Sequence, residues 1–332
     1  MKHRIPFNKP CLVGRELEYI AESVRSGHTS GGGPFMQKAE EFLAERIGAV
    51  RVLLTTSGTA ALELAALLCD IGPGDEVIMP SFTFVSTANA FVLRGAKPVF
   101  VDIDRMTRNL DVNLVEAAVT ERTKAVVPVH YAGVGCEMDP LAKIAATHGL
   151  KVIEDAAQGL DARYRTRHLG TMGDCGVFSF HETKNVTCGE GGALVLPDET
   201  LVARAEILRE KGTDRARFAR GEVDKYTWVD VGSSFISSDL LAAYLYGQLE
   251  HLDRIKERRR QIHERYSAAL LPLYEHGIVD LQNWPAHCHP NYHMFNFLVG
   301  RAVHRADLIA HLASRGILAV FHSVPLHLSL IH

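Results

Sequence analysis

Short β-type runs alternate with helical patterns over residues 51–196, and this alternation limits the possible folds more than any other feature of the chain. A strand, a helix and a second strand form a βαβ unit, and successive units build a parallel sheet with helices packed against it. We therefore expect a layered α/β domain. The expected strands are 51–55, 76–79, 98–103, 125–129, 152–154, 176–180 and 193–196, and the expected helices are 60–69, 86–94, 112–119 and 140–148.

The pattern changes after residue 231. Residues 239–269 read as one long helical region or two joined ones, with an apolar stripe that includes Leu249, Leu252 and Ile262. Acidic residues interleave with the arginines on its polar face, which indicates a solvated face rather than a nucleic-acid helix. Strand-like runs at 295–299 and 318–321 flank a helical pattern at 306–315. We expect a large domain with an N-terminal arm over residues 1–245 and a small α+β domain over 246–332.

Composition excludes several classes of protein. The 332 residues are 47% hydrophobic and 23% charged, with a net charge of −3, which fits a globular chain and offers no chain-wide attraction for nucleic acid. The start MKHRIPFNKP has no signal-peptide core, and no apolar run reaches the ~18 residues of a membrane helix. The six cysteines form no C-x-x-C pair. We expect free thiols, a cytoplasmic location, and no partnership with nucleic acid or membrane.

Histidines gather around one cysteine near the C-terminal end of the chain. His287, Cys288 and His289 are consecutive, and His293 follows them. These ligands lie too close along the chain for a structural zinc site, and no second pair stands at zinc-site spacing. A polar loop before the strand at 294–299 is the expected structure, with no metal.

A single lysine, Lys184, lies between a β-like run and a glycine-rich turn in FSFHETKNVTCGEGGAL at 178–194. Burial penalises the charged form of a lysine, so a lysine at the end of a buried strand can act as a neutral amine. The alternative is a solvated lysine on a hairpin loop, since most lysines are solvated.

A possible phosphate cradle follows the first expected strand, in TTSGTAALELAAL at 55–67. Gly58 would let the backbone approach a ligand closely. The N–H groups near Thr59 and Ala60, with the hydroxyls of Ser57 and Thr59, would hold a dianion at the positive end of the helix. The alternative is an ordinary Ser/Thr helix cap. The phosphate-loop and dinucleotide glycine motifs are missing from the strand–helix turns.

Two further strand ends carry a carboxylate and an aromatic ring. Asp155 follows the apolar strand in KVIEDAAQG, where it could hold a pyridine nitrogen protonated or could cap a helix. Phe82 or Phe84 in MPSFTFVSTANA could stack on a ring or could pack in the core. Together with Lys184 and the phosphate cradle, these groups supply what pyridoxal 5'-phosphate requires.

These motifs resemble the DegT/StrS family of pyridoxal-phosphate sugar aminotransferases, over residues 5–327. The resemblance implies the three-layer aspartate-aminotransferase-type fold, known as fold type I, with a smaller C-terminal domain. The segments that carry it are VIMPSFTFVSTANAFVLRGAKPVFVDID, VPVHYAGV, VIEDAAQG, FSFHETKN, GEGG and VDKYTWVDVGSSF. Members of the family with histidine in place of the lysine are dehydratases, and this chain keeps Lys184.

The resemblance also implies roles for individual residues. Lys184 corresponds to the Schiff-base lysine and Asp155 to the carboxylate at the pyridine nitrogen. The remaining implied cofactor contacts are Gln158 near the ring hydroxyl, Phe84 stacked on the ring, and Thr59, Ala60 and Ser179 at the phosphate.

The family works as a homodimer in which each site is completed by the neighbouring subunit. Many members place an asparagine near the motif SSFISSD, where this chain has Ile236, so Ser234 or Ser237 is expected to replace the cross-subunit phosphate contact. Members also continue beyond the motif FHSVPLH, so the small domain is expected to be short relative to the family, and the chain could be a truncated form.

Within the family, the motifs are most similar to enzymes that transfer an amino group from L-glutamate to C4 of a dTDP-4-keto-6-deoxyhexose. The product implied is dTDP-4-amino-4,6-dideoxygalactose, a precursor for a lipopolysaccharide or another cell-surface glycan. His322 could face the sugar nucleotide or could be a structural histidine. Two alternatives stay open: an aminotransferase for a 3-keto sugar nucleotide or a cyclitol, and a cofactor-binding protein without turnover.

Overall fold

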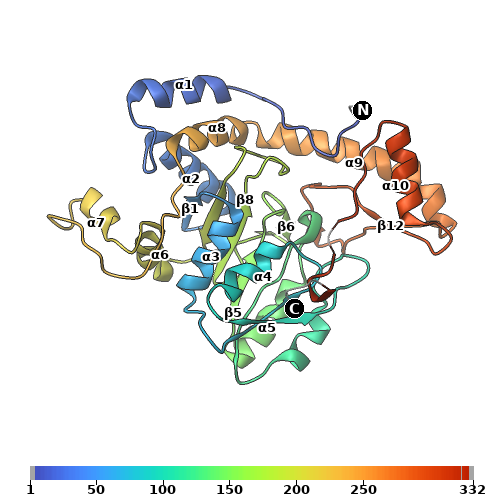
Figure 1. Cartoon of the computed structure of the whole chain (residues 1–332), viewed down its shortest axis with the longest axis horizontal. Coiled ribbons are helices and arrows are strands. Elements are labelled where there is room, and N and C mark those ends of the chain that lie inside the picture. The colour runs from blue at the N-terminus through green and yellow to red at the C-terminus, as the bar shows by residue number, and fades with distance from the viewer. Residues whose placement is uncertain (1–3, 323, 329–332) are drawn as a thin grey trace.

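A seven-stranded sheet forms the centre of the molecule in the computed structural model, which describes residues 4–322 and 324–328 (Figure 1). The strand order is β1-β9-β8-β5-β4-β2-β3. Each of the seven strands expected from residues 51–196 is confirmed, with ends that differ by at most three residues. Their bounds are β1 Arg51–Thr55, β2 Glu76–Pro80, β3 Lys97–Val101, β4 Thr123–Val126, β5 Lys151–Asp155, β8 Cys175–Ser179 and β9 Gly192–Leu196.

One strand departs from the expected parallel sheet. The pairs β2–β3, β2–β4, β4–β5 and β5–β8 are parallel, whereas β9 runs antiparallel to both β8 and β1. Residues 180–191 join β8 to β9 without a helix. Parallel neighbours need a long crossover connection, whereas a short one makes the next strand run in the opposite direction. This hairpin connection carries Lys184.

Helices cover both faces of the sheet, which confirms the three-layer fold. Successive side chains of a strand enter opposite layers: Val52 and Leu54 of β1 lie in one hydrophobic core, and Leu53 lies in the other. The first core is closed by α2 (Pro34–Ile47), α5 (Met138–His148) and α8 (Asp239–Leu249). The second is closed by α3 (Gly58–Leu68), α4 (Val85–Val92) and α6 (Val202–Arg209).

The expected helices at 60–69, 86–94 and 140–148 are confirmed as α3, α4 and α5, but the one at 112–119 is wrong. That segment forms two short 3₁₀ helices, η1 (Val112–Leu114) and η2 (Glu116–Ala118). Its N–H groups bond three residues back, as Val115 does to Val112. Valine is stiff at χ1 and lowers α-helix propensity, which favours the shorter form.

The sequence analysis did not identify several elements outside the alternating region. They include α1 (Glu16–Ser26) and α7 (Arg215–Ala219), and a small sheet of β11 (Cys288–His289), β6 (Arg163–Tyr164) and β7 (Arg167–His168). Figure 1 shows α6 and α7 at one end of the molecule and α10 at the other. The remaining short turns are η3 (Tyr131–Gly133), η4 (Glu199–Leu201) and η5 (Leu326–Leu328).

The long helical region is two joined helices, α8 and α9 (Leu252–Glu275), so the expected boundary at 245/246 falls within α8. After α9, β10 (Val279–Leu281) pairs with β12 (Phe297–Val299), and α10 (Arg305–Ser314) follows. The expected strand at 318–321 is wrong. Among the described residues, Ile317 forms an isolated bridge with Ile5 and Leu318 donates to the Ile5 carbonyl, so this segment pairs with the N-terminal arm rather than with a sheet.

Over the described ranges 4–322 and 324–328, none of the helices combines the length and apolar character that crossing a bilayer requires.

Candidate active site

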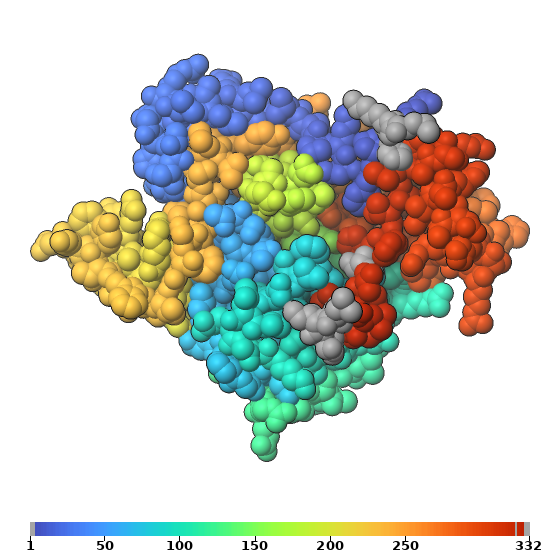
Figure 2. Space-filling model, in the orientation of Figure 1, coloured from blue at the N-terminus to red at the C-terminus, as the bar shows by residue number. Residues whose placement is uncertain are grey.

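A large cavity opens at the carboxyl ends of the central parallel strands. Its volume is about 2090 Å³, well above the ~300–1,000 Å³ of a typical small-ligand pocket. In Figure 2 the surface is hollowed where the blue N-terminal arm, the lime β8–β9 connection and the red C-terminal segments meet. All eight residues proposed from the sequence except Ala60 line it: Thr59, Phe84, Asp155, Gln158, Ser179, Lys184 and His322.

Lys184 projects from the β8–β9 hairpin connection. Its backbone N–H donates to the carbonyl of His181 at 2.9 Å, which closes a turn just after β8. The lysine is therefore on a hairpin loop, as the alternative interpretation held, yet it lines the cavity and is partly buried. Burial lowers the pKa of the Lys184 amine, while the carboxylate of Asp155 acts in the opposite direction. The geometry supplies an amine that is easier to deprotonate than a surface lysine.

The two adjacent carboxylates at the end of β5 have different environments. Glu154 is fully buried and accepts hydrogen bonds from His130 Nε2 at 2.8 Å and from the backbone of Gly170 and Gly173. Burial opposes its ionisation, but these donors outweigh that effect and hold its pKa below the usual value. Glu154 therefore anchors a loop, whereas Asp155 lies in the cavity wall.

Asp155 is held by two donors. Its Oδ2 accepts a hydrogen bond from the hydroxyl of Thr87 at 2.7 Å, and its Oδ1 accepts from the N–H of Ala157 at 3.1 Å. The Thr87 oxygen lies 2.7 Å from the hydroxyl of Thr83. Because Thr87 donates to the carboxylate, Thr83 must donate to Thr87. Sequence reasoning missed both threonines, although their spacing of four residues at a helix start was a usable signal.

The start of α3 lies where the sequence placed a possible phosphate cradle, but the N–H of Ala60 is already bonded within the chain. The hydroxyl of Ser57 caps the helix and accepts from the N–H of Ala60 at 3.0 Å, so the cap interpretation is also correct. The N–H of Ala61 donates to the Ser57 carbonyl and is the first in the helix to bond four residues back. The N–H groups of Gly58 and Thr59 precede it, so they have no acceptor within the helix. Thr59 Oγ1 lies 2.7 Å from Ser86 Oγ, at the start of α4.

Glycine is required at this cradle because the chain passes close to it. A Cβ at Gly58 would lie 2.9 Å from the Cβ of Ser179, and one at Gly192 would lie 2.3 Å from the backbone of Ser57. Ser179 is thereby placed beside the helix start. Free N–H groups, hydroxyls and the positive end of the helix fit a phosphate dianion.

Phe84 and Gln158, which the resemblance assigns to the ring and the ring hydroxyl of the cofactor, both line the cavity. Phe84 precedes α4 and is 67% exposed, so one face is open to the cavity, whereas Phe82 packs 4.9 Å from the Tyr131 ring. Gln158 accepts a 2.6 Å hydrogen bond from the N–H of Ala132 through Oε1. This fixed amide lies at the same cavity wall as Asp155.

His322 lies beside an aromatic side chain of the large domain. Its Nδ1 is 2.9 Å from the Tyr131 hydroxyl. Burial, followed by the positive charge of Lys184, lowers the pKa of His322, which favours the neutral ring. The histidine therefore has a structural partner and also lines the cavity.

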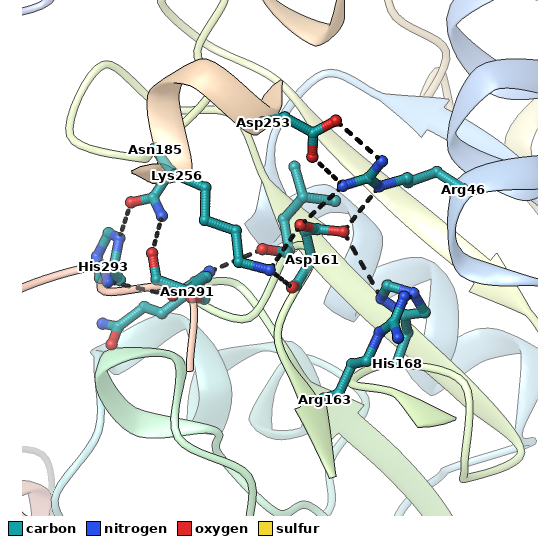
Figure 3. A network of polar contacts seen from close by, with 11 residues as sticks. Arg46, Asp161, Arg163, His168, Asn185, Asp253, Lys256, Asn291 and His293 are labelled. Atoms are coloured by element: carbon teal, nitrogen blue, oxygen red, sulfur yellow. Dashed lines mark hydrogen bonds and ion pairs between the residues drawn. The ribbon is translucent and has the colours of Figure 1, made fainter. Parts of the chain in front are cut away.

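A second histidine that the sequence analysis placed in a polar loop lies at the site. His293 is buried, and its Nδ1 is 2.9 Å from Oδ1 of Asn185, the residue after Lys184 (Figure 3). Asn185 Nδ2 donates to the carbonyl of Asn291 at 3.0 Å, so its Oδ1 faces His293 as an acceptor. Nδ1 of His293 therefore carries the proton. Burial first, then Lys184, Arg259 and His322, lower its pKa well below the usual value.

Asn291 links this histidine to the segment that carries Gln158. Its Nδ2 donates to the carbonyls of Gln158 and Leu160, each at 2.8 Å, and its Oδ1 accepts from the N–H of His293. Figure 3 shows the network continuing to Asp161, which accepts from Arg46 and from Lys256 of α9. The Lys184 and Gln158 segments are thus held to the helices behind them.

The expected cross-subunit replacements differ in exposure. Ile236 forms an isolated bridge with Thr55, and a Cβ at Gly31 would lie 2.6 Å from its side chain, so Ile236 packs within its own chain. Ser237 is buried, whereas Ser234 is exposed. Only Ser234 of the two can reach a neighbouring molecule.

Between residues 4 and 328, with position 323 set aside, no three His, Cys, Asp or Glu side chains gather in a way that could hold a metal ion. Cys288 is buried in β11, and His287 bonds Glu137 at 2.9 Å. Residues 290–296, between β11 and β12, form neither helix nor strand, which agrees with the loop expected before the strand.

The chain is similar to known proteins along most of its length. The model of the DegT/DnrJ/EryC1/StrS aminotransferase family matches residues 10–331. The spore coat polysaccharide biosynthesis protein SpsC of Bacillus subtilis (strain 168) is 42% identical over 270 residues, which are 80% of this chain and 69% of SpsC.

Two solved structures have the same fold. DesV from S. venezuelae, in complex with a ketimine intermediate, is 35% identical with a TM-score of 0.85, over 96% of this chain and 82% of DesV. DesI, in the presence of its TDP-sugar product, is 34% identical with a TM-score of 0.83, over 94% of this chain and 76% of DesI.

Proposed function

Since the chain belongs to the DegT/DnrJ/EryC1/StrS aminotransferase family, we propose that it transfers an amino group from L-glutamate to C4 of a dTDP-4-keto-6-deoxyhexose. The product would be dTDP-4-amino-4,6-dideoxygalactose. That the chain is a sugar aminotransferase dependent on pyridoxal phosphate follows from the family and its solved members. The open alternative of a cofactor-binding protein without turnover is therefore wrong.

One observation carries the assignment of the site: Lys184 and Asp155 line a single cavity, and burial lowers the pKa of the lysine. The cradle around Gly58 and Ser179 would hold the cofactor phosphate, and Phe84 would lie on its ring. Asp155 would bond the pyridine nitrogen, with Thr87 fixing the carboxylate. When bound, the cofactor supplies an aldehyde and an electron-accepting ring.

The protein residues would then orient the reactants and move one proton. Lys184 Nζ, whose pKa is lowered by burial, would accept the proton from the α-carbon of the amino donor and return it as the amino group is transferred. The amino acid leaves as a keto acid, and the keto sugar takes the amino group in the reverse sequence. Asp155 keeps a negative charge where the pyridine nitrogen would lie, which favours its protonated form.

The size of the cavity supports a nucleotide sugar as the second substrate. Its volume of about 2090 Å³ leaves room beyond the cofactor. The TDP-sugar named with DesI and the polysaccharide named with SpsC support a thymidine diphosphate sugar that enters a surface glycan.

We also propose that the protein is a homodimer with shared active sites. The segment around α7 ends in exposed apolar side chains: Trp228 is 80% exposed, and Tyr226, Val229 and Val231 are exposed beside it. A second copy of the chain would cover them. Light scattering coupled to size exclusion tests this, because a monomer at micromolar concentration would contradict it.

Product analysis tests the proposed reaction. The holoenzyme is incubated with glutamate and, in separate samples, with a dTDP-4-keto-6-deoxyhexose, a 3-keto isomer and a cyclitol ketone. We expect a 4-amino sugar nucleotide by mass spectrometry and NMR, and none with Lys184→Ala. Amination at C3, or of the cyclitol alone, would contradict the substrate while leaving the aminotransferase assignment in place.

A further inference from the structure

We propose that Arg108 forms an anion-binding subsite in the wall of the active-site cavity, which takes a carboxylate or phosphate group of a substrate. This proposal rests on the proposed function, because the cavity is the one that holds Lys184. Arg108 lies in the connection after β3, a segment to which no role is assigned above.

The backbone around Arg108 is held in a demanding conformation. Its φ of 66° lies in the left-handed region, which a non-glycine residue adopts at a cost. Asp104 fixes the turn through bonds to the N–H and hydroxyl of Thr107. Asn109 joins the turn to the cavity wall, since its Oδ1 accepts from the N–H of Tyr131 at 2.9 Å. The fold thus places an arginine beside Tyr131.

The guanidinium of Arg108 is buried without enough partners. The residue is 3% exposed, and its Nε and Nη1 have no hydrogen-bond partner among residues 4–322 and 324–328. Nη2 donates only a long bond of 3.4 Å to the carbonyl of Asp280. Buried polar groups are nearly always paired, so two unpaired donors on one guanidinium require an explanation.

The nearest carboxylate is already used by another arginine. Asp280 Oδ2 lies 3.9 Å from Arg108 Nη2 but accepts a 2.9 Å hydrogen bond from Nε of the exposed Arg105. Two arginines therefore share Asp280, and Asp104 acts on Arg108 only as a weaker charge. Burial also lowers the pKa of Arg108, with Asp280 acting in the opposite direction, which is the sign of an undercompensated charge.

An anion entering the cavity would supply the missing charge and acceptors. Arg105 and Arg108 both line the cavity, together with Tyr131 and His322. A planar guanidinium matches the paired oxygens of a carboxylate or a phosphate, and the match is strongest where water is excluded. Arg105 would keep Asp280 neutralised while Arg108 turns to the ligand. The carboxylate would come from the amino donor, and the phosphate from the nucleotide of the acceptor.

Melting temperatures of the holoenzyme, measured without a keto sugar, test the proposal independently of product formation. Arg108→Met removes a buried charge that lacks partners, so its melting temperature without ligand should equal or exceed that of the parent protein. Glutamate and dTDP serve as separate probes. We expect Arg108→Met to lose the stabilisation by one or both probes, and to raise the apparent Kd for that probe at least tenfold. Arg108→Lys should lie between, since it keeps the charge without the planar fork.

Arg165→Met is the matched control, because Arg165 also has a positive φ but is exposed, pairs with Asp139 and lies outside the cavity lining, so this variant should keep both stabilisations. Loss of the glutamate effect identifies the carboxylate, and loss of the dTDP effect identifies the phosphate. The proposal is overturned if neither probe stabilises the parent protein, if Arg108→Met responds like the parent, or if it melts lower without ligand. An Arg108-dependent shift in a protein that aminates no keto sugar would refute the proposed function alone.

Discussion

The hydroxyl of Thr87, in the first turn of α4, donates a 2.7 Å hydrogen bond to Oδ2 of Asp155, at the end of β5. Both groups are buried, and the carboxylate has a second donor in the N–H of Ala157. The bond fixes the direction in which the carboxylate faces the cavity. Asp155 therefore depends on a residue 68 positions earlier in the chain.

We predict that Thr87→Val lowers turnover by roughly tenfold or more. A hydrogen bond to a charged acceptor is worth about 1.5–3 kcal/mol, and its loss leaves Asp155 free to rotate away from the cofactor. Thr83→Val is the control, because it removes the hydroxyl behind Thr87 and leaves the bond to Asp155 intact. Single-turnover rates with glutamate measure both, and an equal loss in the two variants would contradict a direct role for Thr87.

Asp155→Asn should cost more turnover than Phe84→Leu. The carboxylate stabilises charge that develops during the reaction, an electrostatic effect often worth several kcal/mol. The exposed ring of Phe84 offers stacking worth roughly 0.5–1.5 kcal/mol beyond its buried area. The rate of the glutamate half-reaction is measured for both variants. A larger loss of rate in Phe84→Leu would mean that Asp155 serves mainly to accept the hydrogen bond from the N–H of Ala157.

Gly58→Ala should weaken cofactor binding about tenfold or more. The added methyl group would lie 2.9 Å from Ser179 Cβ, so the strand end and the helix start must separate. Gly72→Ala is the matched control, since a Cβ there meets nothing within 4 Å. Equilibrium titration with pyridoxal phosphate gives the dissociation constants. An unchanged constant in Gly58→Ala would place the phosphate elsewhere.

The stability of the fold should fall on acidification partly through His168. Burial, followed by the positive charge of Arg163, lowers the pKa of His168 to about 4. Between pH 6.5 and pH 4 the unfolded state binds a proton that the folded state does not, so the free energy of unfolding decreases as pH falls. This difference can reach about 3 kcal/mol by pH 4.

His168→Gln removes that titration, and His304→Gln makes the same change at an exposed site. Urea unfolding from pH 7 to pH 4 should show a shallower decline for His168→Gln than for the parent protein and the His304 variant. Parallel curves in all three proteins would mean that His168 does not titrate in this range.

The part of the site that could be predicted from sequence consists of residues at strand ends. Lys184, Asp155 and Ser57 each follow an apolar run, and parallel strands bring their carboxyl ends to one edge of a sheet. The local pattern therefore carried the spatial information. The strand β9 was predicted but its antiparallel direction was not, although the absence of a predicted helix between residues 180 and 191 indicates that direction.

The rest depends on contacts between distant segments. Asn291 and His293 form hydrogen bonds with Asn185, more than 100 residues earlier in the chain. Arg108 and Asp280 are 172 residues apart in the chain. No periodicity marks such pairs. The run 318–321 has the composition of a strand, but its neighbour is the N-terminal arm at Ile5 rather than a sheet. Composition indicates the propensity of a segment for extended backbone, whereas a β-strand also requires a neighbouring strand to pair with.

The most direct test of the central claim is the covalent position of the cofactor. Holoenzyme is treated with borohydride, digested, and analysed by mass spectrometry for a phosphopyridoxyl group. The account predicts this label on Lys184, in the peptide that contains FSFHETKN, with loss of the visible absorption band. A label on any other lysine, or none in a protein that still transfers the amino group, would contradict it.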